Sequence, residues 1–330
     1  MRILNKDEIM RRFDSARALK LIEAGLIAHA RGDVQLPPVQ NFRFDTSDGD
    51  CCVKSAYIDG EPAFFVKVST GFYKNARLGL PTNDGLVLAL SASTGEPLVL
   101  LQDGGWLTGA RTALAGAIAA RLLAPDDVHA IGIVGTGEQA RLQLRYLADV
   151  VTCRKAIVWG RGGVQLQAFC KDAAQFGFEV HATLDASELA GSANLIVTAT
   201  PSRVPILRRE WIQPGTHITA VGADAPGKQE LDAAIVGHAD CVIVDSLKQC
   251  AAYGELAHAI AAGLRSEDDA LELGSALADG KRVRRDGSEI TVADLTGLAV
   301  QDAAAAASVL HIGELDQRGG ILHDIRRPVS

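Results

Sequence analysis

The spacing of apolar side chains divides the chain into two parts with different patterns. Between residues 7 and 31, apolar residues such as Ile9 and Ile22 recur every three or four positions, which predicts one amphipathic helix. Short runs rich in Val, Ile, Phe and Tyr, separated by turn residues, follow at residues 51–58, 62–70 and 85–94. They predict antiparallel strands. A helix opened by Thr108 is expected over 107–124, so roughly the first 115 residues form an α+β unit.

From residue 130 onward, the pattern alternates between strands and helices. Continuous apolar runs occur at residues 130–135, 155–160, 178–182, 193–200, 216–223 and 240–246. Helical patterns at 138–150 and 164–176 separate the first of them. Such runs are typical of strands buried on both faces of a parallel sheet with helical crossovers. The fold class is therefore α/β, a Rossmann-type doubly wound parallel sheet beside the α+β unit. Residues 290–310 predict a strand, a turn and an Ala-rich helix that returns to the first unit.

Composition excludes several classes of protein. The chain has 330 residues and a net charge of -7, so it has no excess of Lys and Arg for a nucleic acid or an anionic membrane. No apolar run approaches the roughly 20 residues that span a bilayer, and the first residues lack the apolar core of a secretory signal. We therefore expect a cytoplasmic protein. The 6 cysteines are scattered without metal-ligand spacing, which predicts reduced thiols and no metal.

A glycine pattern follows the first strand of the second part. In "GIVGTGEQAR", Gly135 and Gly137 lie between a strand and a helix, and Ala140 takes the third small position. Backbone amides at such a helix N-terminus can bind a pyrophosphate where a larger residue would hold it away. The alternative is an ordinary tight turn. In this context, the pattern favours a dinucleotide site.

The end of the second strand bears on the choice of dinucleotide. The acidic residue that would bind the ribose 2′-hydroxyl of NAD is missing, and Gly160 and Arg161 stand there in "VWGRGG". A guanidinium can pair with a 2′-phosphate, which favours NADP(H) over NAD(H). A solvated surface arginine, with NAD bound less selectively, is the alternative.

With these residues in place, the sequence resembles the ornithine cyclodeaminase/mu-crystallin family over nearly its whole length. The segments that carry the resemblance are "FFVKVSTGF" (64–72), "GLPTNDG" (79–85), "STGEPL" (93–98), "LTGARTALAGAIAA" (107–120), "GIVGTGEQARLQL" (132–144) and "VGADAPGKQEL" (221–231). The resemblance implies a homodimer with a substrate-binding and dimerisation domain at 1–115, completed by 305–330. The dinucleotide-binding domain is then expected at 116–304.

The resemblance also implies a cluster of cations that binds the substrate carboxylate. It assigns this task to Arg43, Lys67 and Arg111, and it counts Lys67 among the catalytic residues. Lys67 lies in an apolar strand, where an unpaired ammonium would be costly and an anion is required. Arg111 is expected in the first turn of its helix, which the helix dipole disfavours for a cation. The alternatives are a snorkelling Lys67, a surface ion pair for Arg43 and an internal carboxylate for Arg111.

Asp224 is the acid that the resemblance assigns to the substrate nitrogen. It is expected just after a strand, at the carboxyl edge of the sheet where open α/β folds bind ligands. Protonation of the C=N nitrogen makes hydride addition to the carbon easier. A turn aspartate that caps the segment after Pro226 is the alternative. The cofactor contacts expected from the motif and the resemblance are Thr82, Arg111, Gly135, Thr136, Gly137, Glu138, Gln139, Ala140, Gly160, Arg161, Thr200, Val221, Gly222, Lys228 and Leu295.

Two positions depart from the family pattern. Leu295 stands where a serine is common, which puts one polar contact to the nicotinamide in doubt. Lys54 stands near the place where members that cyclise ornithine have a glutamate, and its charge would repel a distal ammonium. If Lys54 points toward the substrate, it could instead bind a second carboxylate, as in iminosuccinate.

The resemblance implies an NAD(P)H-dependent reductase of a small 2-imino acid or cyclic ketimine, or the same enzyme run as an L-amino acid dehydrogenase. Iminosuccinate, pyrroline-2-carboxylate and iminopyruvate are candidate substrates. One alternative is an ornithine cyclodeaminase-type lyase with tightly bound NAD. Another is a non-catalytic binding protein like mu-crystallin, against which Asp224 and the three clamp cations argue.

Overall fold

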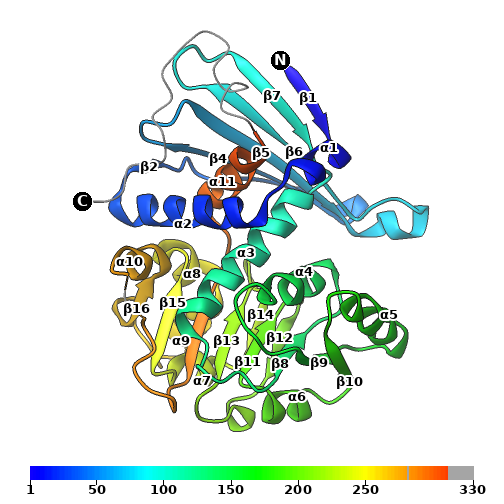
Figure 1. Cartoon of the computed structure of the whole chain (residues 1–330), viewed down its shortest axis with the longest axis vertical. Helices are drawn as coiled ribbons and strands as arrows, with labels where there is room; N and C mark the ends of the chain where they lie inside the picture. Colours follow the sequence, from blue (N-terminus) through cyan, green and yellow to red (C-terminus); the bar gives the residue numbers. More distant parts are fainter. Residues whose placement is uncertain (281, 311–330) are drawn as a thin grey trace. The chain divides into compact units, whose positions relative to one another are not determined.

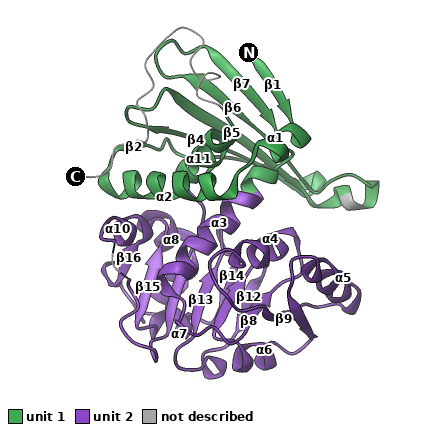
Figure 2. Ribbon diagram, viewed as in Figure 1, with its two compact units in different colours: residues 1–108, 299–330 green, residues 109–298 purple. Residues whose placement is uncertain are grey.

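The computed structural model describes residues 1–280 and 282–310, and it divides the chain into two compact units. Unit 1 comprises Met1–Thr108 and Ala299–Ser330, of which the residues after 310 are not described. Unit 2 is Gly109–Leu298 (Figure 2). The second unit is therefore an insertion in the first.

Unit 1 is built on a seven-stranded sheet in the order β1-β7-β6-β5-β4-β2, with β3 also paired with β4. Its strands are β1 (Arg2–Asn5), β2 (Val34–Gln35), β3 (Gln40–Phe44), β4 (Gly49–Ile58), β5 (Ala63–Phe72), β6 (Asn83–Ser91) and β7 (Pro97–Gln102). The 3-10 turns η1 (Asp45–Ser47) and η2 (Tyr73–Leu78) lie between strands. Only β1 and β7 pair in parallel, and the remaining pairs are antiparallel.

The first helical segment differs from the prediction. Instead of one helix over 7–31, the chain forms α1 (Lys6–Arg12) and α2 (Ser15–Arg31), with Phe13 and Asp14 between them. The Asp14 carboxylate accepts hydrogen bonds from the amides of Ala16 and Arg17 and so starts a new helix. The apolar period is the same in both helices, so hydrophobicity alone did not show the break.

Helix α11 (Ala299–Val309) packs against α2 and against strands β4 and β5 of unit 1. Gly25 allows this approach, because a Cβ atom there would lie 3.0 Å from a methyl group of Val300. The Arg17 guanidinium donates hydrogen bonds to the carbonyl of Ser308 at 3.0 Å and to two neighbouring carbonyls. A cation at the carboxyl end of a helix satisfies carbonyls that have no partner within the helix.

Unit 2 is built on an eight-stranded parallel sheet in the order β10-β9-β8-β11-β13-β17-β15-β16 (Figure 1). Its strands are β8 (Ile131–Val134), β9 (Lys155–Trp159), β10 (Glu179–Thr183), β11 (Leu195–Thr198), β13 (His217–Ala220), β15 (Cys241–Val244), β16 (Ala270–Glu272) and β17 (Thr291–Asp294), while β12 (Arg203–Leu207) and β14 (Gln229–Leu231) form a separate pair. Its helices are α3 (Trp106–Leu123, which begins in unit 1), α4 (Glu138–Leu147), α5 (Gly163–Ala174), α6 (Ala186–Ser192), α7 (Ala233–Gly237), α8 (Leu247–Tyr253), α9 (Glu255–Ala261) and α10 (Leu273–Ala278), with 3-10 turns η3 (Arg209–Trp211) and η4 (Glu267–Asp269).

Side chains from both faces of this sheet enter hydrophobic cores. Leu195 and Val197 of β11 pack with residues of α3, α4 and α5, whereas Ile196 between them packs with residues of α6, α7, α8 and α9. Successive residues of a strand point to opposite faces, so helices cover both sides of the sheet. The predicted fold class, a doubly wound parallel sheet with an additional α+β domain, is confirmed.

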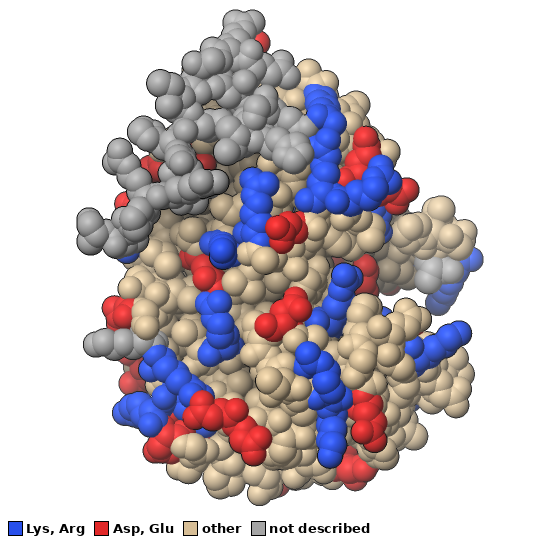
Figure 3. All heavy atoms as spheres, viewed as in Figure 1, with Lys and Arg blue, Asp and Glu red and all other residues tan. Residues whose placement is uncertain are grey.

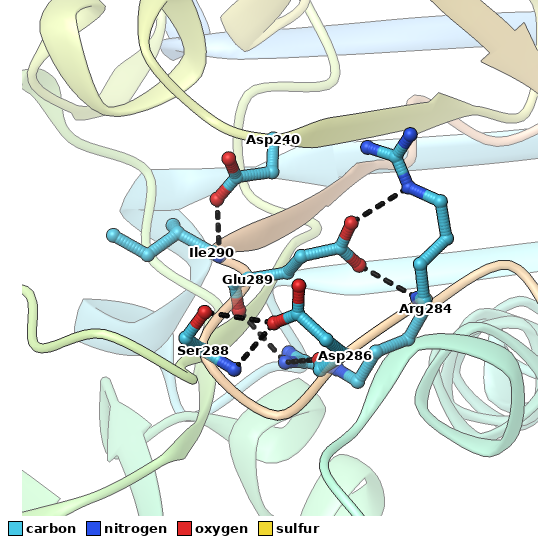
Figure 4. Close-up of polar contacts among 7 residues, drawn as sticks. Asp240, Arg284, Asp286, Ser288, Glu289 and Ile290 are labelled. Atoms are coloured by element: carbon cyan, nitrogen blue, oxygen red, sulfur yellow. Dashed lines mark hydrogen bonds and ion pairs between the residues drawn. The ribbon is translucent and has the colours of Figure 1, made fainter.

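A charged turn over 284–290 leads into β17, and Figure 4 shows its contacts. The buried Glu289 carboxylate accepts hydrogen bonds from the Arg285 amide and side chain, each at 2.8 Å. The Asp240 carboxylate accepts from the Ile290 amide at 2.8 Å. These bonds fix the amino end of β17, whose other end belongs to the candidate site.

The unit boundaries differ in detail from those expected from the sequence. The expected changes of domain at 115/116 and 304/305 fall inside α3 and α11, whereas the chain leaves unit 1 after Thr108 and returns at Ala299. Most of α3 belongs to unit 2 and all of the described α11 belongs to unit 1, so both boundaries fall at or near the beginning of a helix and not in its middle. The rest of the expected C-terminal segment, 311–330, lies outside the described residues.

Candidate active site

The glycine loop after β8 needs its first glycine for two reasons. Gly135 has φ of 120°, a conformation that residues with a Cβ rarely adopt, and a Cβ there would lie 2.8 Å from the Ala199 carbonyl oxygen. Its amide donates to the Trp159 carbonyl at 2.9 Å. The loop is therefore held at the point where β8 lies between β9 and β11, which is the reversal point of the strand order.

The N-terminus of α4 fits an anion. Gly137 is the N-cap and supplies no side-chain cap, and no heavy atom lies within 4 Å of a Cβ built on it. The first amides of α4 are therefore open to a pyrophosphate oxygen, as a dinucleotide site requires. The buried Nε2 of Gln139 has no hydrogen-bond partner among the described residues and offers a further donor. Glu138 and Thr136 flank this cradle, and Ala140 is buried beneath it.

Arg141, which the sequence analysis did not single out, fixes the same loop. Its guanidinium donates to the carbonyls of Thr136 and Gly137 and forms an ion pair with Asp172 of α5 at 2.7 Å. It thereby ties the glycine loop to the next crossover helix. An arginine four residues after the second glycine is one helical turn away, which is the signal that could have identified it.

At the end of β9, Gly160 and Arg161 occupy the position expected to contact the ribose. A Cβ at the buried Gly160 would lie 2.6 Å from the Thr136 methyl group, so the glycine permits close contact with the phosphate loop. Arg161 follows with an exposed side chain. The described geometry leaves its guanidinium accessible to a ligand.

Glu230 joins the loops that follow β11 and β13. One carboxylate oxygen accepts from the Thr200 amide at 2.6 Å, and the other accepts from the Thr198 hydroxyl at 2.7 Å and the Gly222 amide at 2.8 Å. The side chain is fully buried, and burial raises the pKa of Glu230 to about 7. No local sequence pattern identifies Glu230, because the groups that it binds are distant in sequence.

Three further buried carboxylates lie along the same part of unit 2. Asp294 at the end of β17 accepts from the Leu256 amide at 2.9 Å, and burial raises its pKa to about 7. Glu255 accepts from the amides of Glu230 and Leu231, and burial followed by the nearby Asp294 raises its pKa. Asp245 accepts from the Gly297 amide at 2.6 Å. Together they connect the loops at the carboxyl ends of β13, β15 and β17.

Asp224, the expected acid, lies four residues beyond the end of β13 and is 49% exposed. Its carboxylate pairs with the Lys228 ammonium at 2.5 Å. The Asp224 carboxylate is therefore held by a side chain and stays accessible from solvent. Thr200 and Gly222 lie near the ends of the neighbouring strands, and Val221 is buried behind them. The structure thus brings these expected residues to one edge of the sheet.

Arg111 is buried and lies against Gly297. A Cβ at Gly297, which has φ of 87°, would lie 2.6 Å from a guanidinium nitrogen of Arg111. The expected position of Arg111 was wrong: α3 begins at Trp106, so Arg111 is in the second turn. Because the helix dipole acts mainly within the first turn, it gives no argument for a special role of Arg111. Leu295 is also buried and offers no polar group.

In unit 1, strand register places three expected substrate-binding cations on one face of the sheet. Lys54 is directly opposite Lys67 in the β4–β5 pair, and Arg43 of β3 is opposite Asp50 of β4. Residues opposite one another share a face, as do alternate residues of one strand, so Arg43, Lys54 and Lys67 project from the same side. Thr82 is half-buried just before β6.

The buried Lys67 has an internal carboxylate partner. Its ammonium lies 2.6 Å from Asp302 of α11, and the two side chains are 6% and 4% exposed. The expectation that Lys67 requires an anion is met by the chain itself, so its burial no longer argues for a substrate carboxylate. Arg43 is 82% exposed and pairs with Asp45 at 3.2 Å, as in the surface alternative. The substrate roles of both residues stay predictions.

Among the described residues, no group of three or more His, Cys, Asp or Glu side chains could hold a metal ion. Over the same residues, no helix has the length and hydropathy needed to cross a membrane. On the face drawn in Figure 3, Lys and Arg are spread among Asp and Glu and do not form one continuous basic area.

The parallel sheet and the glycine loop define a dinucleotide-binding protein of the doubly wound class, with an exposed carboxylate on a loop at the ligand-binding edge. Residues 1–312 match the ornithine cyclodeaminase/mu-crystallin family. The chain belongs to this family, which confirms the resemblance.

Relatives of known sequence extend over most of the chain. An uncharacterized cyclodeaminase of Sinorhizobium fredii is 41% identical over 290 residues, which cover 87% of this chain and 88% of the relative. The iminosuccinate reductase of Paracoccus denitrificans is 31% identical over 325 residues, which cover 98% of this chain and 99% of the relative.

Solved structures agree with the fold over both units. A dimeric archaeal alanine dehydrogenase with bound NAD has a TM-score of 0.85 at 33% identity and covers 94% of both chains. The Paracoccus denitrificans iminosuccinate reductase with NAD+ has a TM-score of 0.86 at 32% identity and covers 96% of both chains. The Thermococcus litoralis Δ1-pyrroline-2-carboxylate reductase with NADH and L-proline has a TM-score of 0.88 at 26% identity, covering 94% of this chain and 96% of that one.

Proposed function

We propose that this protein reduces the C=N bond of a small 2-imino acid or cyclic ketimine with NAD(P)H, and catalyses the reverse oxidation of the L-amino acid. An NAD-dependent oxidoreductase acting on C=N or CH–NH groups is the enzyme class of its named relatives, and this chain is assigned to that class. The observation that carries the proposal is the conjunction, in one unit, of an open phosphate cradle and an exposed Asp224 beyond the end of β13.

The residues of the chain divide the work as follows. Arg43, Lys67 and Arg111 bind the substrate carboxylate and fix the C=N carbon, and Asp224 gives a proton to the nitrogen. The nicotinamide, when bound, supplies the hydride that this carbon receives. The C=N bond becomes CH–NH, and NAD(P)H becomes NAD(P)+. Lys67 is held for this task by Asp302, and an oriented ammonium loses less freedom when it binds substrate.

The test is NADH and NADPH oxidation at 340 nm with pyrroline-2-carboxylate, piperideine-2-carboxylate, and pyruvate, glyoxylate or oxaloacetate supplied with an amine. We expect turnover of at least one substrate, and loss of about 100-fold or more in Asp224→Asn. Ammonia release from ornithine without net absorbance change would establish the lyase instead. Dinucleotide binding without turnover of any of these compounds would favour the non-catalytic binder.

We infer that Lys54 selects a substrate with a second carboxylate. The support is its place opposite Lys67 on the same face of the sheet: Asp302 neutralises one of the two ammonium groups, and the second adds positive charge beside that pair. Lys54→Glu should weaken turnover of iminosuccinate at least 10-fold more than turnover of pyrroline-2-carboxylate, as measured by kcat/KM for both. Equal losses with the two substrates would refute this role.

We also propose that NADP(H) is preferred. The support is the exposed Arg161 after β9 and the absence of an acidic residue there. Arg161→Ala should raise the Kd for NADPH about 10-fold and leave the Kd for NADH within about twofold, measured by nucleotide fluorescence titration. The same small effect on both nucleotides would show that Arg161 is a solvated surface residue. A homodimer and a cytoplasmic location complete the proposal.

A further inference from the structure

We propose that Glu230 is a positioning residue that fixes the loop bearing Asp224 relative to the Thr200 segment. Its catalytic consequence rests on the function proposed above, but the structural claim does not. The loop in question is 222–230, which begins after β13 and runs into β14. Asp224 and Lys228 lie within it and pair with each other.

The Glu230 carboxylate closes this loop at its base. It accepts from the Gly222 amide at 2.8 Å, so the first and last residues of the loop meet. On its other oxygen it accepts from the Thr200 amide at 2.6 Å, and so it also holds the segment after β11. One buried side chain therefore links the segment after β11 to both ends of the loop that bears the expected acid.

The packing around Gly222 and Glu230 leaves little room for another conformation of the loop. A Cβ at Gly222 would lie 2.2 Å from the Thr200 carbonyl oxygen and 2.4 Å from a Glu230 carboxylate oxygen. The main chain of Glu230 is fixed in turn, because its amide donates to Glu255 at 2.7 Å. Near the β14 end of the loop, the His258 ring donates to the Lys228 carbonyl at 2.9 Å. Asp224 thus stands on a loop fixed at both ends.

Glutamine is the informative replacement because it keeps the size of the side chain. Its amide nitrogen would face either the Gly222 amide or the Thr200 amide, so Glu230→Gln must lose one of these two hydrogen bonds. Glu289→Gln is the matched control: Glu289 is also a buried carboxylate that accepts from a backbone amide, but it lies before β17 in the turn of Figure 4.

The first measurement is amide hydrogen exchange by mass spectrometry on the full-length protein without nucleotide. We expect Glu230→Gln to speed exchange at least 10-fold in peptides that report Thr200 and Gly222, and Glu289→Gln to leave them unchanged. Unaltered exchange there in Glu230→Gln would overturn the proposal. Thr198→Val removes one donor to the same carboxylate and should speed exchange in the same peptides to a smaller extent. If Glu230→Gln does not fold, the exchange rates of Thr198→Val test whether the Glu230 carboxylate fixes the loop.

The second measurement separates positioning from general stability by a double-mutant cycle on kcat. Misplacement of a reacting group can cost about 100-fold, so Glu230→Gln should lower kcat about 10- to 100-fold with Asp224 present and less than threefold in the Asp224→Asn background. Equal losses in both backgrounds would show that Glu230 does not act through Asp224. If the wild type reduces no imine, the proposed function fails while the exchange experiment still tests the loop.

Discussion

At the scale of single residues, the charged residues proposed for function differ in their exposure. Asp224 and Arg161 are exposed, whereas Lys67 and Glu230 are buried and bonded to other groups of the protein. A buried charge without a partner is costly, so each buried group is tied to a defined neighbour. Asp302 therefore holds the Lys67 ammonium in place, and Glu230 holds the main chain at Thr200 and Gly222.

The Lys67–Asp302 pair should be strongly coupled in stability. Asp302→Asn would leave a buried ammonium without its carboxylate, and loss of one partner from a buried pair costs about 3–5 kcal/mol. Urea denaturation should show this loss, and Lys67→Met combined with Asp302→Asn should recover part of it.

The exposed Arg43–Asp45 pair is the control for this experiment. Asp45→Asn should change the free energy of unfolding by less than about 1 kcal/mol, because water screens that pair. If Asp302→Asn lowered the free energy of unfolding no more than Asp45→Asn does, the Lys67–Asp302 pair would not be strongly coupled in stability.

The glycine loop could be predicted from the sequence, whereas the buried residues that support the neighbouring loops could not. Gly135 was singled out because a small residue between a strand and a helix is a local pattern, whereas Asp224 was assigned by the resemblance and its role stays a prediction. Glu230 and Asp302 were missed because their roles depend on contacts between segments far apart in sequence. A single sequence carries no signal for a carboxylate that binds distant backbone amides.

At the scale of secondary-structure elements, the parallel sheet was predicted more completely than the antiparallel one. Buried parallel strands are continuous apolar runs, and each of the six predicted in unit 2 is present. In unit 1, strands β1, β2, β3 and β7 were not predicted: β1, β2 and β3 are short and mostly exposed, whereas β7 is a largely buried run of six residues that was overlooked. The break between α1 and α2 was missed because Asp14 interrupts the helix without changing its apolar period.

The exposed aromatic residues of β3, Phe42 and Phe44, are a place at which the proposed homodimer can be tested. Phe42 is 52% exposed on the opposite face of the strand from Arg43, and large exposed apolar side chains are typical of protein interfaces. Phe42→Glu should convert the dimer to monomer in light scattering after size exclusion. Val164→Glu, at a 77% exposed site in α5, is the control and should leave the mass unchanged. A dimeric Phe42→Glu protein would place the interface elsewhere.

At the scale of the whole molecule, stability should respond to pH through groups whose pKa values burial shifts. Burial, followed by the nearby Arg284, lowers the pKa of His217 from 6.5 to about 3. The unfolded chain therefore binds a proton at this histidine between these values while the folded chain does not, so stability falls as pH falls. For Glu230, with a pKa raised from 4.5 to about 7, the sign is reversed: stability falls as pH rises through that window.

Comparison of variants separates these two opposing contributions. His217→Gln should flatten the decline of unfolding free energy between pH 6.5 and 3 by up to about 1.4 kcal/mol per pH unit, relative to wild type. Urea titrations at several pH values would measure it. Parallel curves for the two proteins would mean that His217 is protonated in the folded state, despite its hydrogen bonds to Thr219 and Thr291.

The interruption of unit 1 by unit 2 has a consequence for biosynthesis. Strand β5, with Lys67, leaves the ribosome long before α11, with Asp302, because all of Gly109–Leu298 is translated between them. Until α11 has been synthesised, Lys67 lacks the Asp302 carboxylate that lies beside it in the folded unit. Unit 2 is one continuous segment and can fold as soon as it has been translated. Unit 1 can be completed only after α11 has been synthesised, near the end of translation.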